Sequence, residues 1–328
     1  MNNKRSLTWI LLITIVLVMG VVLLGPRPEF GKASNLHDFS NMSLLELEAQ
    51  IRSQEEAIPN LRPDAKKLIV WASPQAPTRT KYVLIFFHGY TASRREFDPV
   101  LQNLAQRLKA NLFLTRFAGH GFVGPDGHRG ITAQAWLDDC AEAVSAGKAL
   151  GEHIILVGSS TGASLALWSS TQPNWNIAGL ILVSPNFGPK DPMANLLNWP
   201  WAFVLVKMVL GDYRTFPTHN ERHAEAWDVT HHTDSLLPMA AVVERVRSLD
   251  PKLITVPVLV IYHPQDPAIN HQITQELFKN WASNQKYLVT SQLQAPNNLH
   301  VLAGDLLSPG GNQILEDLSY EFIVQNIP

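Results

Sequence analysis

The stretch from Ile154 to Trp168 reads IILVGSSTGASLALW, and it decides the fold. Its first four residues form a short apolar run typical of a buried strand, and its last residues suit a helix. Between them stands G-x-S-x-G, residues 158–162, which marks a sharp strand-to-helix turn in this context. We call these five residues the elbow. Such a turn lifts its central serine above the sheet, so Ser160 rather than Ser159 is the candidate nucleophile.

Other short apolar runs alternate with amphipathic stretches along the chain. Runs of this kind are typical of strands buried on both faces, and their alternation with helices predicts a mostly parallel sheet with helices on both faces. The predicted strands are Lys67–Trp71, Tyr82–Phe87, Leu112–Phe117, Ile154–Val157, Leu180–Val183, Val258–Tyr262 and Lys286–Val289. The predicted helices between them include Pro99–Lys109, Thr132–Leu150 and Gln272–Trp281.

The domain organisation follows from where this alternation holds. With 328 residues the chain is long for one domain, but α/β folds often reach this size with an insertion. We expect residues 1–25 to be a membrane anchor, 26–64 a tether with a short amphipathic helix, and 65–328 one catalytic domain. Residues 187–250 break the alternation and are rich in Trp, Pro and His, which predicts an inserted cap.

The N-terminal segment has no charged residue between Arg5 and Arg27. Its apolar run from Leu7 to Gly25 has about the 20 residues needed to cross a membrane, which predicts a transmembrane helix. Lys4 and Arg5 precede the run, so the positive-inside tendency predicts a cytoplasmic N-terminus and a catalytic domain on the extracytoplasmic side. A cleaved signal peptide is the alternative, although no small-x-small site ends the apolar run.

A second motif lies upstream of the elbow, where an apolar run leads into residues 88–92, His-Gly-Tyr-Thr-Ala. In folds with such an elbow, the loop after the third strand supplies one of two backbone N–H groups that stabilise the oxyanion of acyl transfer. We assign these donors to Tyr90 and Thr161. The side chain of His88 is expected to be buried and structural.

Catalysis by a serine hydroxyl also needs an imidazole to take its proton and a carboxylate to orient that imidazole. In this kind of fold the chain order is serine, then acid, then histidine. Asp266 follows a predicted strand and His300 lies after the next one, so both fall at the carboxyl edge of the sheet. We therefore predict a triad of Ser160, Asp266 and His300. His263 and Asp305 violate the order and are expected to be structural.

Together these motifs resemble those of the small bacterial carboxylesterases and monoacylglycerol lipases of the α/β-hydrolase superfamily, a group that overlaps the serine aminopeptidase-like families. The likeness begins at about Tyr82 and leaves out the cap. Its landmarks are His88-Gly89-Tyr90-Thr91, Ala118-Gly119-His120-Gly121, Trp136 with Asp139, the elbow, Asp266 and His300-Val301. The resemblance implies the α/β-hydrolase fold, hydrolysis of acyl esters and no cofactor. Gly162-Ala163 stands where the family usually has Gly-Gly.

Composition restricts the partners. A net charge of -2 with only 16% charged residues lacks the basic surface that nucleic acid requires. Cys140 is the single cysteine, so no intrachain disulfide can form. A group of histidines, His219, His223, His231 and His232, invites a metal interpretation, but no carboxylate or cysteine arrangement completes a recognisable site, and we expect no metal.

The apolar run at residues 198–206 of the predicted cap has two interpretations: a helix packed over the core, or a lid whose aromatic face contacts lipid and admits an acyl chain. The expected partners are a small acyl-ester or lipid substrate, and a membrane contacted through the N-terminal helix and, in the second interpretation, the cap. The expected function is a serine hydrolase of carboxylic esters. A peptidase, thioesterase or acyltransferase with the same triad, and a silent membrane-tethered binding module, are the alternatives.

Overall fold

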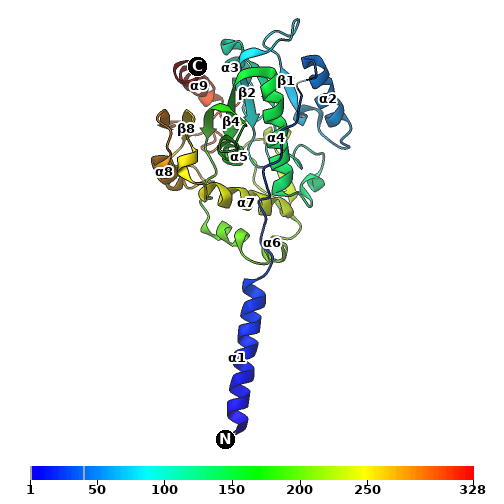
Figure 1. The fold of residues 1–328 in the computed structure, drawn as a ribbon, viewed down its shortest axis with the longest axis vertical. Coiled ribbons are helices and arrows are strands. Elements are labelled where there is room, and N and C mark those ends of the chain that lie inside the picture. The colour runs from blue at the N-terminus through cyan, green and yellow to red at the C-terminus, as the bar shows by residue number, and fades with distance from the viewer. Residues whose placement is uncertain (1, 40) are drawn as a thin grey trace.

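This computed structural model describes residues 2–39 and 41–328, and its body is a seven-stranded sheet with helices on both faces (Figure 1). The strand order is β1-β3-β2-β4-β5-β8-β9, and only β1 runs antiparallel to its neighbour. The predicted mostly parallel α/β sheet is therefore confirmed. The strands are β1 Leu68–Val70, β2 Thr80–Phe87, β3 Asn111–Leu114, β4 Gly151–Ser159, β5 Ile177–Val183, β8 Val258–Tyr262 and β9 Lys286–Thr290.

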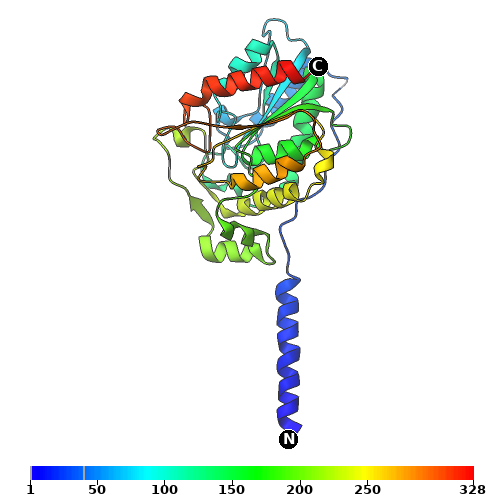
Figure 2. The ribbon, with the colours of Figure 1, turned by 90° about the vertical axis from the view of Figure 1, so that its left-hand side faces the viewer.

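The helices fall on two sides of this sheet because side chains alternate along each strand. In β2, Val83 and Ile85 pack into a core with α4, α5 and α7, while Leu84 and Phe86 pack into a second core with α3 and α9. Figure 2 shows α9 (red) and α7 (yellow) well apart. The helices are α1 Asn2–Leu23, α2 Leu44–Glu56, α3 Val100–Leu108, α4 Ala133–Leu150, α5 Thr161–Ser170, α6 Ala202–Leu210, α7 Leu236–Arg247, α8 His271–Asn280 and α9 Asn312–Asn326.

Between β5 and β8 the chain leaves the sheet for residues 184–257, which we call the insert. It contains α6, a small antiparallel pair of strands, β6 (Tyr213–Thr215) and β7 (Thr230–His232), and then α7. Helix α7 is largely buried against the body, whereas α6 buries only two of its side chains, Ala202 and Val206. The exposed apolar side chains of α6 are Phe203, Val204, Leu205, Met208, Val209 and Leu210. The predicted cap, residues 187–250, lies within the insert, and its role stays a prediction.

The N-terminal prediction is wrong. Helix α1 spans Asn2–Leu23 and stands apart from the body (Figure 1). Among the residues that the structure describes, no helix is both long enough and apolar enough to cross a membrane. The expected membrane anchor at residues 1–25 is therefore wrong, and so is the expected extracytoplasmic location of the catalytic domain, which depended on it. The expected orientation depended on Lys4 and Arg5, whose side chains lie outside the described part.

The residues after α1 lie against the body. Phe30 meets the Trp168 ring of α5 edge to face at 5.4 Å, and the His37 N–H donates to Ser145 Oγ on α4 at 2.9 Å. Helix α2 then begins with a capping box in which Ser43 and Glu46 each accept a hydrogen bond from the other's backbone N–H. This segment therefore covers α4 and ends on a helix with a defined start.

Candidate active site

The elbow joins the end of β4 to the start of α5 and places Ser160 between them. Ser160 has φ 50° and ψ -115°, a sparsely populated conformation whose strain is on the order of 1–3 kcal/mol. The turn is tight enough to exclude side chains on both sides. A Cβ on Gly158 would lie 2.5 Å from the Ala163 Cα, and one on Gly162 would collide with the Phe87 carbonyl oxygen. The spacing of the motif is thus a steric requirement of the turn.

The structure brings Ser160, His300 and Asp266 together from three separate loops. His300 Nε2 lies 3.0 Å from Ser160 Oγ, and His300 Nδ1 lies 2.7 Å from Asp266 Oδ2. Asp266 is buried in the loop after β8, where its Oδ1 also accepts the N–H groups of Ala268 and Ile269 at 2.7 and 3.1 Å. The carboxylate is therefore held from both sides, with one oxygen left for the imidazole.

His300 is held in the loop after β9 by Asn298, whose Oδ1 accepts the His300 N–H at 2.8 Å and the Val301 N–H at 2.9 Å. Its side chain keeps 19% of its surface exposed, so the imidazole faces the site. Burial disfavours the charged ring, but the charge and hydrogen bond of Asp266, with a further contribution from Glu96, raise the pKa of His300 overall. An imidazolium formed by taking the Ser160 proton is stabilised in this position.

The two predicted oxyanion donors, Tyr90 and Thr161, line the same small cavity beside the elbow. Among the described residues, no group accepts a hydrogen bond from either backbone N–H. The Tyr90 hydroxyl is bonded to Ser235 Oγ of the insert at 2.7 Å, which fixes the tyrosine in place. Both N–H groups thus remain free for a ligand oxygen.

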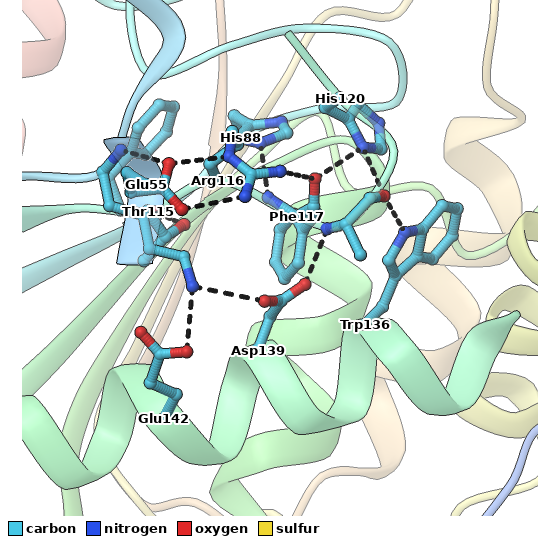
Figure 3. Close-up of polar contacts among 12 residues, drawn as sticks. Glu55, His88, Thr115, Arg116, Phe117, His120, Trp136, Asp139 and Glu142 are labelled. Atoms are coloured by element: carbon cyan, nitrogen blue, oxygen red, sulfur yellow. Dashed lines mark hydrogen bonds and ion pairs between the residues drawn. The ribbon is translucent and has the colours of Figure 1, made fainter. Parts of the chain in front are cut away.

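The loop that carries Tyr90 is braced by His88. Its Nδ1 lies 2.9 Å from the Gly89 carbonyl oxygen and its Nε2 accepts the Phe117 N–H at 3.1 Å, so the proton belongs on Nδ1. Burial lowers the pKa of His88 to about 4, and the ring stays neutral. Figure 3 shows this ring beside the residues 116–120, where Trp136 Nε1 donates to the Ala118 carbonyl and Asp139 accepts the Ala118 N–H.

Behind this loop lies a buried ion pair that ties α2 to the sheet (Figure 3). Arg116 Nε and Nη2 donate to the two carboxylate oxygens of Glu55 at 2.7 and 2.8 Å, and the side chains are only 6% and 2% exposed. Burial alone would raise the pKa of Glu55, but the bonds and charge of Arg116 lower it overall. The pair is therefore fully ionised at neutral pH.

We predict that Glu55→Gln lowers the free energy of unfolding by about 3–5 kcal/mol, because it removes the carboxylate that is bonded directly to the buried Arg116 charge. Urea unfolding at pH 7.5 measures the change. Glu56→Gln is the matched control, since Glu56 is the next residue and is exposed. A loss below about 1 kcal/mol in Glu55→Gln, equal to that of the control, contradicts the prediction.

The other polar candidates lie elsewhere. His263 Nε2 is buried against the Leu293 carbonyl at 3.1 Å, and Asp305 Oδ1 accepts a bond from Asn312 at 2.6 Å, so neither contacts Ser160. The four histidines of the insert, His219, His223, His231 and His232, each bond to backbone groups. In the part of the chain that the structure describes, no group of three or more His, Cys, Asp or Glu side chains is placed to hold a metal ion.

Sequence reasoning missed two residues of this region, Asn298 and Glu96. Asn298 stands two residues before His300, a spacing at which Asn commonly caps its own backbone, so the pattern could have identified it. Glu96 is buried beside the elbow, but in the sequence it follows Ser-Arg-Arg, which is typical of a solvated turn. No local signal distinguishes it.

Comparison with known proteins agrees with this architecture. A family model described as serine aminopeptidase, S33, matches residues 78–293. The chain is similar to a solved lipolytic enzyme from work on the metagenome-derived LipS and LipT, with a TM-score of 0.65 at 19% identity over 81% of this chain and 100% of that one. It is also similar to a monoacylglycerol lipase from Paleococcus ferrophilus, with a TM-score of 0.61 at 16% identity, covering 79% and 98%.

A soluble variant of the Saccharomyces cerevisiae monoglyceride lipase, solved with a substrate analogue, gives a TM-score of 0.57 at 14% identity, covering 80% of this chain and 92% of that one. Among curated proteins no sequence matches this chain. At such identities the structural likeness establishes the shared fold. Because the family model covers more than half of the 328 residues, the chain belongs to the serine aminopeptidase, S33, family of the α/β-hydrolase fold.

Proposed function

We propose that this chain is a serine hydrolase that cleaves carboxylic esters through Ser160, His300 and Asp266. One observation carries the proposal: Ser160 Oγ lies 3.0 Å from an imidazole nitrogen whose ring is held at 2.7 Å by a buried carboxylate. This arrangement can take a proton from the hydroxyl and stabilise the resulting imidazolium. The triad, the oxyanion donors and the ester substrate are parts of the proposal.

The proposed reaction proceeds in two halves. His300 Nε2 takes the Ser160 proton as Oγ bonds to the ester carbonyl carbon, and the Tyr90 and Thr161 N–H groups stabilise the oxyanion. When the C–O bond to the alcohol breaks, His300 returns that proton to the leaving oxygen. Water then attacks the acyl-serine, His300 takes its proton, and the acid leaves as the proton returns to Oγ.

The charges around Ser160 favour an ester over an aminopeptidase substrate. An aminopeptidase must bind the α-ammonium group of a peptide, for which a free carboxylate is the natural partner. The two carboxylates that act electrostatically on His300 are already engaged, Asp266 by the imidazole and two backbone N–H groups, and Glu96 by Gly89 and Ser159. We therefore place esters first, with peptides and thioesters as the competing substrates.

Labelling with a fluorophosphonate probe tests the proposal directly. The folded protein should react at one site, and mass mapping of the labelled peptide should identify Ser160 rather than the adjacent Ser159. Heat-denatured protein is the control, because it retains both serines but no activated nucleophile. A matched panel of ester, thioester and amide substrates then ranks the leaving groups. Absence of labelling in the folded protein would remove the proposal in favour of a binding module.

We further propose that the insert is a cap that favours medium-length, apolar acyl groups, supported by the exposed apolar side chains of α6. We predict that kcat/KM for p-nitrophenyl esters rises by about fourfold per CH₂ over the first few carbons, since a buried CH₂ contributes about 0.8 kcal/mol. A sharp preference for acetyl esters contradicts it.

Substitution in α6 separates this cap effect from general reactivity. Met208→Ser, at a position 77% exposed, should reduce hydrolysis of a long-chain ester presented as an emulsion and leave soluble acetate hydrolysis unchanged. Ile314→Ser is the matched control, because Ile314 is 50% exposed on α9, far along the chain from the insert. Equal effects of the two variants would count against a lipid-facing role of α6.

A further inference from the structure

Glu96 is a buried carboxylate, 2% exposed, in the segment between β2 and α3. Its Oε2 accepts the Gly89 N–H at 2.7 Å, and its Oε1 accepts the Ser159 hydroxyl at 2.8 Å. Gly89 directly precedes the oxyanion donor Tyr90, and Ser159 directly precedes Ser160. One side chain therefore joins the residues on which both halves of the site depend.

The backbone around Glu96 also contacts the loop that carries His300. The Asp305 N–H donates to the Asp98 carbonyl at 2.9 Å. A Cβ on Gly304 would collide with the Glu96 carbonyl oxygen, so that loop lies directly on the segment. The oxyanion loop, the elbow and the histidine loop thus meet at residues 96–98.

Electrostatics couples Glu96 to the base. Burial raises the pKa of Glu96 to about 7, although the Gly89 N–H, the Ser159 hydroxyl and the charge of His300 each lower it. For His300, burial is outweighed by Asp266 and, to a smaller extent, by the charge of Glu96. The groups bonded to Glu96 are Gly89 and Ser159, and its charge acts on His300 without a direct bond. The groups bonded to His300 are Asp266 and Ser160.

We propose that Glu96 is a positioning residue of the reaction: it holds the oxyanion loop against the elbow, and its negative charge supports the imidazolium form of His300. The inference rests on the proposed function and adds a second acid to it. Asp266 orients the imidazole by direct contact, whereas Glu96 acts from behind Ser159 and touches no reacting atom. A purely structural Glu96 would hold the loops without altering the protonation of His300.

The test is Glu96→Gln, which keeps the shape of the side chain, can accept the Gly89 N–H and can donate to Ser159, but carries no charge. We expect kcat for a p-nitrophenyl ester at pH 8 to fall about 5- to 50-fold with KM changed less than about twofold. The acid limb of the pH profile of kcat/KM should move to lower pH by up to about 0.5–1 unit. The reason is that the imidazolium loses the carboxylate charge that Glu96 carries above its pKa of about 7.

Glu152→Gln is the matched control: the same change at an exposed glutamate at the opposite end of β4. It should leave both kcat and the acid limb unchanged. Glu96→Asp keeps the charge on a shorter side chain, so its acid limb should stay near that of wild type even as kcat falls. An unchanged acid limb in a folded Glu96→Gln variant overturns the inference.

Should Glu96→Gln fail to fold, Ser159→Ala carries the test. Loss of that hydroxyl donor makes the Glu96 charge less favourable, so the acid limb should shift in the same direction by a smaller amount. An unchanged acid limb overturns the inference.

Failure of the proposed function is a separate outcome, seen in wild type as no ester hydrolysis and no fluorophosphonate label on Ser160. An active, labelled wild type with an unshifted Glu96→Gln profile refutes the role of Glu96 alone.

Discussion

Replacing Ser160 by alanine will reduce kcat for ester hydrolysis by about 10⁴- to 10⁶-fold. The change removes the hydroxyl that lies 3.0 Å from His300 Nε2, so no acyl-enzyme can form. The residual rate reflects the oxyanion donors and substrate binding. Steady-state hydrolysis of p-nitrophenyl butyrate measures the loss, and circular dichroism checks that the fold survives.

Ser159→Ala is the matched control for Ser160→Ala, since the two serines are adjacent in the elbow. The Ser159 hydroxyl points to Glu96 at 2.8 Å rather than to the imidazole. Its loss should cost no more than about tenfold in kcat, the size expected of a support rather than a nucleophile. Full activity in Ser160→Ala, or abolished activity in Ser159→Ala alone, refutes the assignment.

Asp266→Asn is predicted to lower kcat by about 10⁴-fold with the fold intact. The asparagine oxygen can still accept the N–H groups of Ala268 and Ile269, which turns its NH₂ toward His300. The imidazole then carries its proton on Nε2, the atom that must accept the Ser160 proton. The His300 Nε2–H and the Ser160 O–H are then two donors that face each other. Because Nε2 can no longer accept the Ser160 proton, the proton is not transferred.

The comparison for this variant is Asp305→Asn. Asp305 is the other acidic candidate near His300 in the sequence, and it bonds Asn312 at 2.6 Å instead. It should retain kcat within about twofold, since it touches none of the three residues. A large loss in Asp305→Asn together with an active Asp266→Asn would reverse the assignment of the acid. Thermal unfolding of both variants separates chemistry from stability.

The elbow was predictable because its pattern states a local steric requirement. A Cβ on Gly158 would meet the backbone of Ala163 within the same strand-turn-helix unit, and one on Gly162 would meet the Phe87 carbonyl oxygen of the neighbouring strand β2. Asp266 and His300 are far apart in sequence, but each follows a predicted strand. In a parallel sheet, strand ends collect at one edge, so order along the chain was enough to predict that the structure would bring them beside Ser160.

Features that depend on distant packing were not predictable in this way. Glu96 is buried with its carboxylate bonded to Gly89 of its own loop and to Ser159 of β4, which lies 63 residues away along the chain. Strand β3 ends at Leu114 although the predicted strand extended to Phe117, and Arg116, just beyond the strand, pairs with Glu55. The burial of a charge depends on its partner, and the partner lies 61 residues away along the chain.

The N-terminal run misled for a different reason. Hydropathy counts apolar residues, whereas a membrane span requires one continuous helix of sufficient length. Helix α1 ends at Leu23, before the predicted end of the run at Gly25, and its first turns are polar.

The helices of the insert were harder to predict than those of the body. Its apolar run at residues 198–206 allowed a helix as one of two interpretations, and α6 begins within that run, at Ala202. The sequence did not predict α7, which is largely buried against the body.

The strained backbone of Ser160 bears on the stability of the folded chain. Glycine adopts that backbone conformation far more readily than serine, so exchange of the serine for glycine would relieve strain and raise thermal stability. The same exchange would remove the hydroxyl, so the strain and the proposed nucleophile would be lost together. The gain in stability of Ser160→Gly would therefore measure how much this turn costs the folded state.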